Sequence, residues 1–155
     1  MTRCIKPEDL DSIPEEERLL LDNQLCFPLY SAANAVVRAY RPLLEELDLT
    51  YLQYLVMMVL WQNNGISVKA LGDRLYLDSG TLTPLLKRLE VKGIVVRKRS
   101  QSDERVRELH LTEQGISLKY KAMSVPNSMI CKLNLQLDEL ITLKTICEKV
   151  INNLS

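Results

Sequence analysis

The sequence lacks any long apolar stretch. None of its hydrophobic runs approaches the roughly 18 uninterrupted apolar residues that a membrane-spanning helix requires. Residues 1–22 carry seven acidic side chains against three basic ones, rather than a basic segment followed by an apolar one. We therefore expect a cytoplasmic protein with no membrane partner. The hydrophobic content of 46% and the charged content of 26% are ordinary for one soluble globular domain.

Residue types that bind metals or crosslink chains are also few. The sequence has one histidine, His110, and its four cysteines show no CxxC spacing. Zinc sites need clustered Cys and His ligands, and disulfide frameworks are rare in a reducing compartment. We therefore expect no metal site, no cofactor and no structural disulfide framework.

A net charge is absent as well, since 20 Lys and Arg balance 20 Asp and Glu. The charges are nevertheless segregated along the chain. Between residues 87 and 107, eight basic side chains stand against three acidic ones, so this segment is basic by five. A basic stripe is the electrostatic footprint of phosphate binding, although so short a run is more often just a solvated face. Charge alone leaves both interpretations open.

Glycine is scarce too, with 5 residues, and the chain has no internal repeat and no Gly/Ser linker. One continuous, mostly helical unit is therefore predicted. Apolar residues at helical spacing predict a long helix over about 23–46, which Pro42 would end or kink. A second helix is predicted over about 50–61, with Thr50 as its N-cap, and a third over 68–75.

A fourth helix is predicted after a break at residues 78–80, and Gly93 ends it. Its buried stripe consists of Leu82, Leu85, Leu86 and Leu89. Its first residue stays open, because local rules favour Thr83 as the N-cap and Pro84 as the first helical residue. A helix that binds DNA would have to begin nearer Asp78. Together, the third and fourth helices and the turn between them form a helix-turn-helix.

From Ile94 onward the spacing of apolar residues changes from helical to alternating. Residues 94–99 and 106–111 are predicted as strands around a polar tip, residues 100–105, which makes a β-hairpin wing. Helices are predicted again over about 112–123 and 127–154. The fold class is therefore mainly α with a small β-hairpin wing. Because aromatic residues make up only 5% and apolar helices lie at both ends, the core needs a partner surface. We expect these helices to form a homodimer.

A helix-turn-helix followed by a basic hairpin is typical of DNA-binding proteins. The second helix fits the major groove, and the hairpin reaches the adjacent minor groove. The alternative is a helix with an ordinary solvated face. At the wing tip, contact of Arg105 with a narrow minor groove competes with an exposed ion pair in the turn. Double-stranded DNA is the predicted partner, and the side chains expected to contact it are Ser79, Thr81, Thr83, Lys87, Arg88, Arg99, Asp103 and Arg105.

Cys26 lies two residues before Pro28, and proline is tolerated in a helix only within its first turn. Cys26 is therefore predicted at the start of the first long helix. The partial positive charge there favours a thiolate, which is the form that attacks a peroxide. A buried cysteine acting as a small apolar residue is the alternative. Tyrosines at positions 30, 40, 51 and 54 either hydrogen-bond such a thiolate or form only the edge of the core.

The remaining cysteines and the histidine carry weaker predictions. Cys147 is expected in the core and Cys4 in a disordered tail. Cys131, at the start of the last helical region, is either inert or a resolving thiol. His110 falls in a wing strand with no nucleophile-base arrangement around it, and no arginine is obviously placed beside Cys26. We therefore predict no catalytic residue and no enzyme.

The chain resembles the organic hydroperoxide resistance regulators of the MarR family in three segments, which read LCFPLYSAANAVVRAYRPLLEELDLTYLQYLVMMVLW, VKALGDRLYLDSGTLTPLLKRLEVKG and SQSDERVRELHLTEQG. The resemblance covers about residues 22–126. It implies a dimeric repressor that binds a pseudo-palindromic operator and leaves it when an organic hydroperoxide oxidises the cysteine of the LCF motif, here Cys26. The tyrosines that orient the thiolate in such proteins match Tyr30, Tyr40 and Tyr51.

Members of that family either cap a single reactive cysteine with a small thiol or use a second cysteine that forms a disulfide across the dimer. Cys131 resembles this second cysteine. The chain departs from the family at Leu52, where proline is usual, and at Pro28, where alanine or leucine is common. Neither departure removes a polar group.

The resemblance also suggests how the chain is organised. We expect a polar leader over 1–22 and a single MarR-type domain over 23–155. Within this domain, the winged helix-turn-helix covers about 50–112, and the dimerisation helices cover about 23–47 and 113–154. The alternative function is a MarR-type repressor released by a small phenolic or drug-like ligand.

Overall fold

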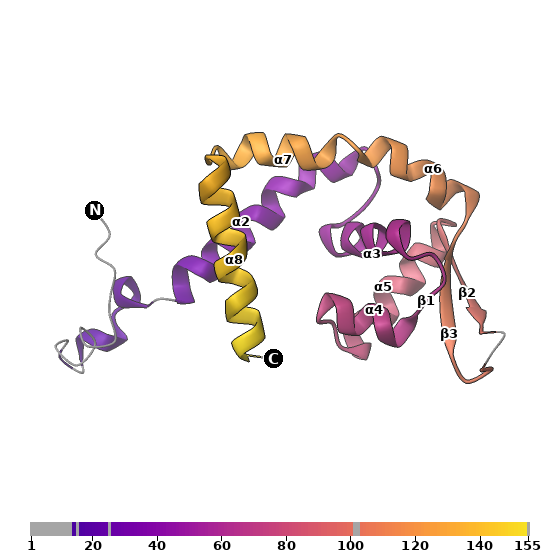
Figure 1. The fold of residues 1–155 in the computed structure, drawn as a ribbon, viewed down its shortest axis with the longest axis horizontal. Coiled ribbons are helices and arrows are strands. Elements are labelled where there is room, and N and C mark those ends of the chain that lie inside the picture. The colour runs from indigo at the N-terminus through magenta and orange to yellow at the C-terminus, as the bar shows by residue number, and fades with distance from the viewer. Residues whose placement is uncertain (1–13, 15, 25, 101–102, 155) are drawn as a thin grey trace. The chain divides into compact units, whose positions relative to one another are not determined.

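The computed structural model describes residues 14, 16–24, 26–100 and 103–154, so Cys4 and most of the predicted leader over 1–22 lie outside the described residues. The chain forms two compact units, Met1–Arg38 and Ala39–Ser155, and each is described by itself. The boundary between them falls within helix α2 (Cys26–Glu45) (Figure 1).

Helix α2 begins at the residue that the position of Pro28 predicts. Cys26 is its first residue and Pro28 its third, within the turn whose N–H groups have no helical partner. Two short 3-10 turns, η1 (Glu17–Leu19) and η2 (Leu21–Asn23), precede the helix. Pro42 does not end α2, which continues to Glu45.

Helices α4 (Val68–Leu75) and α5 (Ser79–Val91) provide the predicted helix-turn-helix, and α3 (Tyr51–Gln62) precedes it. Thr50 caps α3 in a capping box, in which the Gln53 N–H donates to the Thr50 hydroxyl at 3.4 Å and the Thr50 N–H donates to the Gln53 side chain at 3.0 Å. Ser67 caps α4 by accepting the Ala70 N–H at 3.1 Å. Side-chain caps therefore fix where both helices begin.

Helix α5 begins at Ser79, which decides the boundary that the sequence left open. The Asp78 carboxylate accepts the Thr81 N–H at 2.7 Å and the Thr81 hydroxyl at 3.2 Å, so Asp78 is the N-cap. Pro84 lies inside the helix. Of the two starts that the sequence left open, the one near Asp78 is therefore correct, because the cap at Asp78 and the burial of Leu82 already fix the helix before the proline.

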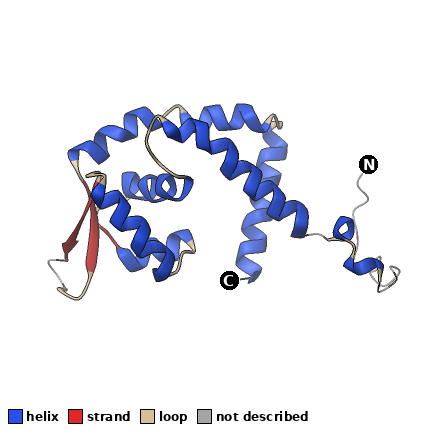
Figure 2. Ribbon diagram, turned by 180° about the vertical axis from the view of Figure 1, so that it is seen from behind, coloured by secondary structure: helices blue, strands red, loops and turns tan. Residues whose placement is uncertain are grey.

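Three strands form one antiparallel sheet in the order β1-β3-β2 (Figure 2). β2 (Val95–Arg99) and β3 (Arg107–Leu111) are the predicted wing, with Val95 opposite Leu111. β1 (Ile66–Ser67) adds a third strand, with Ile66 opposite Leu109. The sequence does not predict β1, because two residues are too few to show an alternating pattern.

The hydrophobic core of the second unit lies where α3, α5 and the sheet meet. The predicted leucine stripe of α5 is buried, and Leu86 and Leu89 are fully enclosed. These side chains belong to one cluster with Met57 and Leu60 of α3 and with Leu109 of β3. Because this face of α5 is enclosed, its opposite face is the exposed one.

Three helices follow the wing: α6 (Glu113–Ala122), α7 (Val125–Leu133) and α8 (Leu137–Leu154). The prediction of one helical region over 127–154 is wrong, because Asn134 adopts a left-handed conformation with φ 50° and ends α7. Cys131 therefore lies near the end of α7, not at the start of the last helix. Among the described residues, no helix combines the length and the apolar character needed to cross a membrane.

Replacing Leu86 by alanine should lower the free energy of unfolding by about 2–5 kcal/mol, because it removes a buried side chain and leaves a cavity. Leu86 is 0% exposed. Val91→Ala, on the same helix but 82% exposed, should change stability by less than about 0.5 kcal/mol. Urea denaturation followed by circular dichroism measures both. Equal effects of the two substitutions would contradict the assignment of the buried face.

Candidate nucleic-acid interface and redox site

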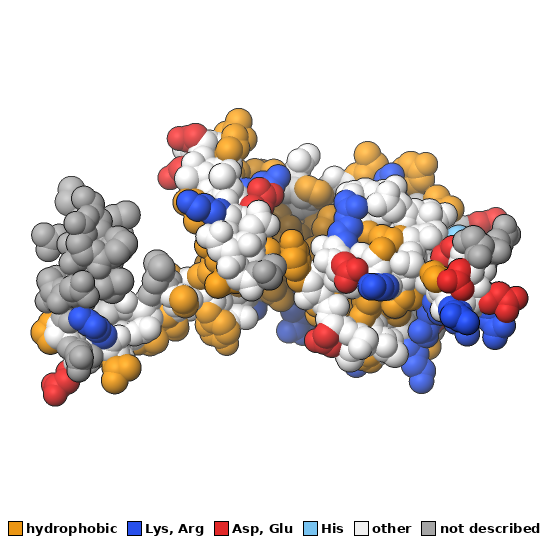
Figure 3. Space-filling view, turned by 60° about the horizontal axis from the view of Figure 1, so that its bottom comes forward, with side chains coloured by type: hydrophobic (Ala, Val, Ile, Leu, Met, Phe, Trp, Pro, Cys, Tyr) orange, Lys and Arg blue, Asp and Glu red, His pale blue; other side chains and the backbone are white. Residues whose placement is uncertain are grey.

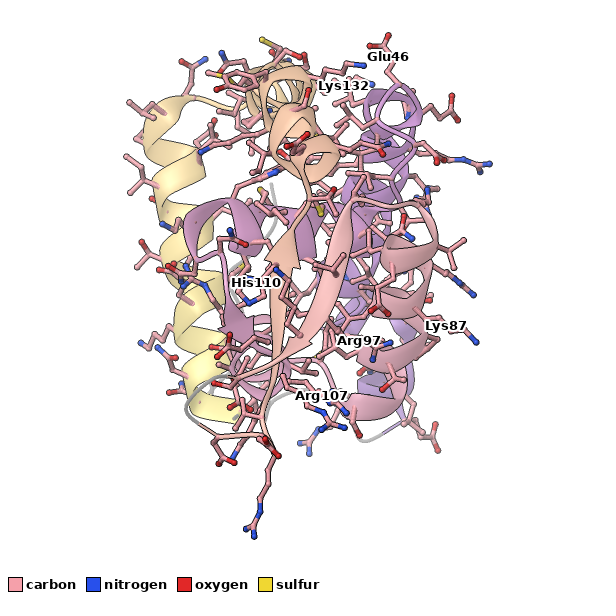
Figure 4. All side chains as sticks on the ribbon, turned by 90° about the vertical axis from the view of Figure 1, so that its right-hand side faces the viewer. Glu46, Lys87, Arg97, Arg107, His110 and Lys132 are labelled. Atoms are coloured by element: carbon pink, nitrogen blue, oxygen red, sulfur yellow. The ribbon has the colours of Figure 1, made fainter. Side chains whose placement is uncertain are left out.

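The exposed face of α5 carries three of the predicted DNA-binding side chains. Ser79, Thr83 and Lys87 recur every four residues and are all exposed, so they lie on one side of the helix. Arg88 is exposed next to them. Figure 4 shows Lys87 pointing outward from α5. This face therefore presents hydroxyl and cationic groups that suit base edges and phosphates.

Thr81 differs from the other predicted side chains of α5. It is only half-exposed, and its hydroxyl donates to the Asp78 carboxylate at 3.2 Å. The same carboxylate accepts the Thr81 N–H, and these two hydrogen bonds hold the pKa of Asp78 below its ordinary value of 3.8. The Thr81 side chain thus completes the cap of α5.

A hollow of about 510 Å³ borders the exposed face of α5. Thr50 and Gln53, at the start of α3, line one side of it. The residues that line it from α5 and its C-cap are Pro84, Lys87, Arg88, Val91 and Lys92. The candidate interface thus extends from α5 to the start of α3, which sequence reasoning missed because Thr50 is recognisable there only as a cap.

Two cations of the basic segment are engaged in ion pairs. The Arg97 guanidinium lies 2.5 Å from the Glu90 carboxylate and joins β2 to α5 (Figure 4). The Lys92 ammonium lies 2.8 Å from Asp48, in the loop before α3. Within the described ranges, the remaining six have no ion pair; they are Lys87, Arg88, Lys98, Arg99, Arg105 and Arg107.

The turn at the wing tip is held by Asp103. Its carboxylate accepts the Arg105 N–H at 2.9 Å, and its carbonyl accepts the Val106 N–H at 2.9 Å, which is a turn geometry typical of aspartate. The ion pairs of the described residues do not include one between Asp103 and Arg105. Arg99, Asp103 and Arg105 are all exposed. Figure 3 shows Lys and Arg side chains gathered, with a few acidic ones, around the part of the second unit that carries the wing.

In the first unit, Cys26 is a free thiol with an exposed side chain at the start of α2. Its neighbours Phe27 and Leu29 are exposed as well, and Tyr30 is 69% exposed. An exposed thiol can be reached by a peroxide. The large apolar side chains around it form a surface of the kind that a partner covers.

In the second unit, Tyr40 and Tyr51 contact each other, with ring centroids 4.7 Å apart. Tyr54, which is 2% exposed, lies 6.0 Å from Tyr40. Burial raises the pKa of all three hydroxyls, and neighbouring tyrosines raise it further for Tyr40 and Tyr54. The three phenols therefore stay protonated at neutral pH and can donate hydrogen bonds. The sequence names Tyr54 only as a possible member of this group, because it does not show that Tyr54 packs against Tyr40.

The later cysteines and the histidine occupy distinct places in the second unit. Cys131 is a free, exposed thiol on α7, and Cys147 is half-buried on α8, outside the core that was predicted for it. His110 lies on β3 as predicted, with its Nε2 atom 3.1 Å from a Glu108 carboxylate oxygen. In the part of the chain that the structure describes, no three His, Cys, Asp or Glu side chains are grouped to hold a metal ion.

The arrangement of α4, α5, the sheet and the exposed cations defines a winged-helix transcriptional regulator. The family model described as "Transcriptional regulator SarA/Rot" matches residues 38–122. The chain is 47% identical over 114 residues to the organic hydroperoxide resistance transcriptional regulator of Bacillus subtilis (strain 168), covering 74% of this chain and 78% of that protein. It is 38% identical over 138 residues to the regulator SarZ of Staphylococcus saprophyticus, covering 89% of this chain and 94% of that one.

Among solved structures, the chain is similar to reduced AbfR bound to DNA, with a TM-score of 0.75, 35% identity, and coverage of 91% of this chain and 96% of that one. AbfR is a protein of Staphylococcus epidermidis. The chain therefore belongs to the MarR-type transcriptional regulators, in the group that contains the organic hydroperoxide resistance regulators. This membership confirms the predicted fold class and the prediction that the protein is a regulator and not an enzyme.

The cap at Asp78 predicts a specific pH dependence of stability. Because its folded-state pKa is depressed, the ionised carboxylate stabilises the folded state above pH 3.8, and this contribution is lost as the pH falls through the lower folded-state pKa. Asp78→Asn keeps an acceptor but no charge, so its deficit in the free energy of unfolding should be present at pH 6 and shrink below pH 3.8. Ser67→Ala, at the cap of α4, serves as a control that does not titrate. Denaturant titrations across this range measure both, and a pH-independent deficit for Asp78→Asn would contradict the prediction.

Proposed function

We propose that this protein is a homodimeric repressor that binds operator DNA through α5 and the wing in its reduced state and is released when an organic hydroperoxide oxidises Cys26. The observation that carries the proposal is the exposed face of α5, together with six cations of the segment 87–107 that form no ion pair among the described residues. Its redox part is supported by the named relatives. One is an organic hydroperoxide resistance regulator, and AbfR has solved structures described as reduced, overoxidised and disulfide-formed.

DNA binding is supported by the different side chains that α5 and the β2–β3 hairpin expose. Ser79, Thr83 and Lys87 are arranged for the major groove, where base edges are distinguishable. Arg105 lies at the exposed tip of the hairpin, where an arginine suits the negative potential of a narrow minor groove. The ion pair between Arg97 and Glu90 joins the hairpin to α5, so it helps to fix the position of the hairpin relative to the helix.

The homodimer is supported by helices that the chain does not enclose. α2 has one buried residue, Leu44, and α8 has none. The large apolar side chains exposed on α8 are Leu137, Ile141, Leu143, Ile146, Ile151 and Leu154. Burying such helices stabilises them far more than helix propensity alone, and a second copy offers the same faces in matching register.

The proposed sensing reaction begins at the Cys26 sulfur. The thiolate attacks one oxygen of the hydroperoxide and the O–O bond breaks, so that Cys26 becomes a sulfenic acid and the peroxide leaves as an alkoxide that takes up a proton to become an alcohol. The Cys131 thiol then attacks the sulfenic sulfur, which forms an S–S bond and releases water. Cellular thiols reduce the disulfide and restore both cysteines. Tyr30, Tyr40 and Tyr51 are assigned to orient the thiolate.

The alternative effector, a phenolic or drug-like ligand, is less well supported. A hollow between α3 and the α6–α7 segment, lined in part by Tyr54, Met58 and Trp61, measures about 210 Å³. Pockets for drug-sized ligands usually measure about 300–1,000 Å³. The larger hollow of about 510 Å³ borders the face of α5 that is proposed to bind DNA, and a reactive thiol needs no pocket, so the observations favour the peroxide.

Arg105→Ala should weaken operator binding and reduce the slope of log affinity against log salt by about 1, because one cation no longer displaces a counterion from DNA. The control is Lys149→Ala, which removes an exposed cation of α8 and should leave the slope unchanged. The measurement is fluorescence anisotropy across a salt series, on a duplex selected from random sequence by the reduced protein. An unaltered slope for Arg105→Ala would remove the wing tip from the proposed interface.

Cumene hydroperoxide should weaken operator binding by the wild type at least about 10-fold, within the usual range of coupling between two sites. Cys26→Ser should bind normally and not respond. Cys131→Ser should form the sulfenic acid but no disulfide, and Cys147→Ser serves as a control that responds like the wild type. Anisotropy and peptide mapping give the two readouts. Undiminished binding by the oxidised wild type would overturn the proposal, and release of Cys26→Ser by a phenolic ligand would favour the alternative.

A further inference from the structure

The start of α6 contacts residues 93–94, the short segment that joins α5 to β2. Gly115, in the first turn of α6, lies very close to this segment. A Cβ atom placed on Gly115 would stand 2.1 Å from the Ile94 carbonyl oxygen. The same carbonyl accepts the Thr112 N–H at 3.2 Å, and the Thr112 hydroxyl donates to the Gly93 carbonyl at 2.6 Å. The backbone of α6 thus contacts the chain where α5 leads into β2.

Trp61 contacts the same turn of α6. Its indole N–H donates to the Gly115 carbonyl oxygen at 2.9 Å, across 54 positions of sequence. Trp61 lies near the end of α3, and its ring meets that of Tyr54 edge-on, with centroids 6.3 Å apart. Tyr54 in turn packs against Tyr40. A chain of aromatic contacts therefore leads from the end of α2 to the first turn of α6.

The contact of Gly115 with Ile94 also lies between the two parts of the chain to which the redox chemistry is assigned, Tyr40 on α2 and Cys131 on α7. Tyr40 belongs to the tyrosines proposed to orient the Cys26 thiolate. On the other side, α6 is followed after Met123 and Ser124 by α7, which carries Cys131. A shift at either place reaches α5 and the wing through Gly115, because close-packed backbone contacts transmit displacement and do not absorb it.

We propose that Trp61 is a positioning residue that couples oxidation to DNA release, by holding the first turn of α6 against the chain between α5 and β2. The inference rests on the proposed function and deepens it. Without the Trp61 hydrogen bond, α6 is held to α3 less firmly, so a displacement of α6 or of the tyrosines is transmitted to α5 only in part. The cysteine chemistry itself is untouched, since Trp61 takes no part in it.

The test compares Trp61→Phe, which keeps an aromatic ring but removes the N–H donor, with Tyr120→Phe, a control on the exposed side of α6. Operator affinity is measured by anisotropy before and after cumene hydroperoxide, while peptide mapping quantifies oxidation of Cys26 and Cys131. Trp61→Phe should be oxidised as fully as the wild type and bind DNA normally when reduced. Its loss of affinity on oxidation should be smaller than that of the wild type by about 5-fold or more, whereas Tyr120→Phe should match the wild type.

Gly115→Ala provides a second test, which can contradict the inference even if Trp61→Phe folds poorly. Gly115→Ala places a methyl group against the Ile94 carbonyl, so it should weaken DNA binding in the reduced state while leaving oxidation of Cys26 unchanged. If the wild type responds to peroxide and Trp61→Phe loses affinity to the same extent, or if Gly115→Ala binds DNA normally, the inference is wrong and the proposed function stands. If the wild type itself does not respond, the proposed function is wrong and the inference is wrong with it.

Discussion

The buried leucine stripe of α5 is the constraint on which the rest of the structure depends. Leu82, Leu85, Leu86 and Leu89 insert into a cluster shared with α3 and β3, and this burial fixes the rotation of the helix about its axis. Ser79, Thr83 and Lys87 face outward because the leucines face inward. The chemistry of the exposed side therefore depends on packing that makes no contact with DNA.

The helices near the two ends of the chain, α2 and α8, are not packed in this way. α8 has no buried residue, and α2 has one, although both carry apolar side chains at helical spacing. The winged helix can enclose its own core, whereas these helices cannot. In the single chain, most of the apolar side chains of α8 and α2 are therefore left exposed, as the proposed homodimer requires.

Much of this arrangement could be predicted from the sequence, because it is governed by local rules. Pro28 places the start of α2 at Cys26, and Thr50 places the start of α3. The alternating residues of 94–99 and 106–111 predict the wing. Sequence reasoning does not locate a helix end where a tertiary contact or a single backbone angle determines it. Pro84 obeys a local rule for helix starts that the Asp78 cap and buried Leu82 override. Asn134 breaks a run of apolar residues that reads as one helix.

The candidate site shows the same limit. The helical spacing identifies Lys87, and the polar turn identifies Arg105, as exposed cations. The sequence does not show that Lys92 is paired with Asp48 or Arg97 with Glu90, because each of these partners lies on another element. Tyr54 is likewise visible only as one tyrosine among several until its ring is seen packed against Tyr40.

Trp61 has a further consequence, which concerns how the molecule responds to light. It is the only tryptophan in the chain, so excitation at the red edge of protein absorption addresses a single indole. Its ring lies beside Tyr54, which in turn lies beside Tyr40, at separations over which excited tyrosines pass their energy to an indole. The emission excited at that edge is therefore a signal from one place, the contact between α3 and α6.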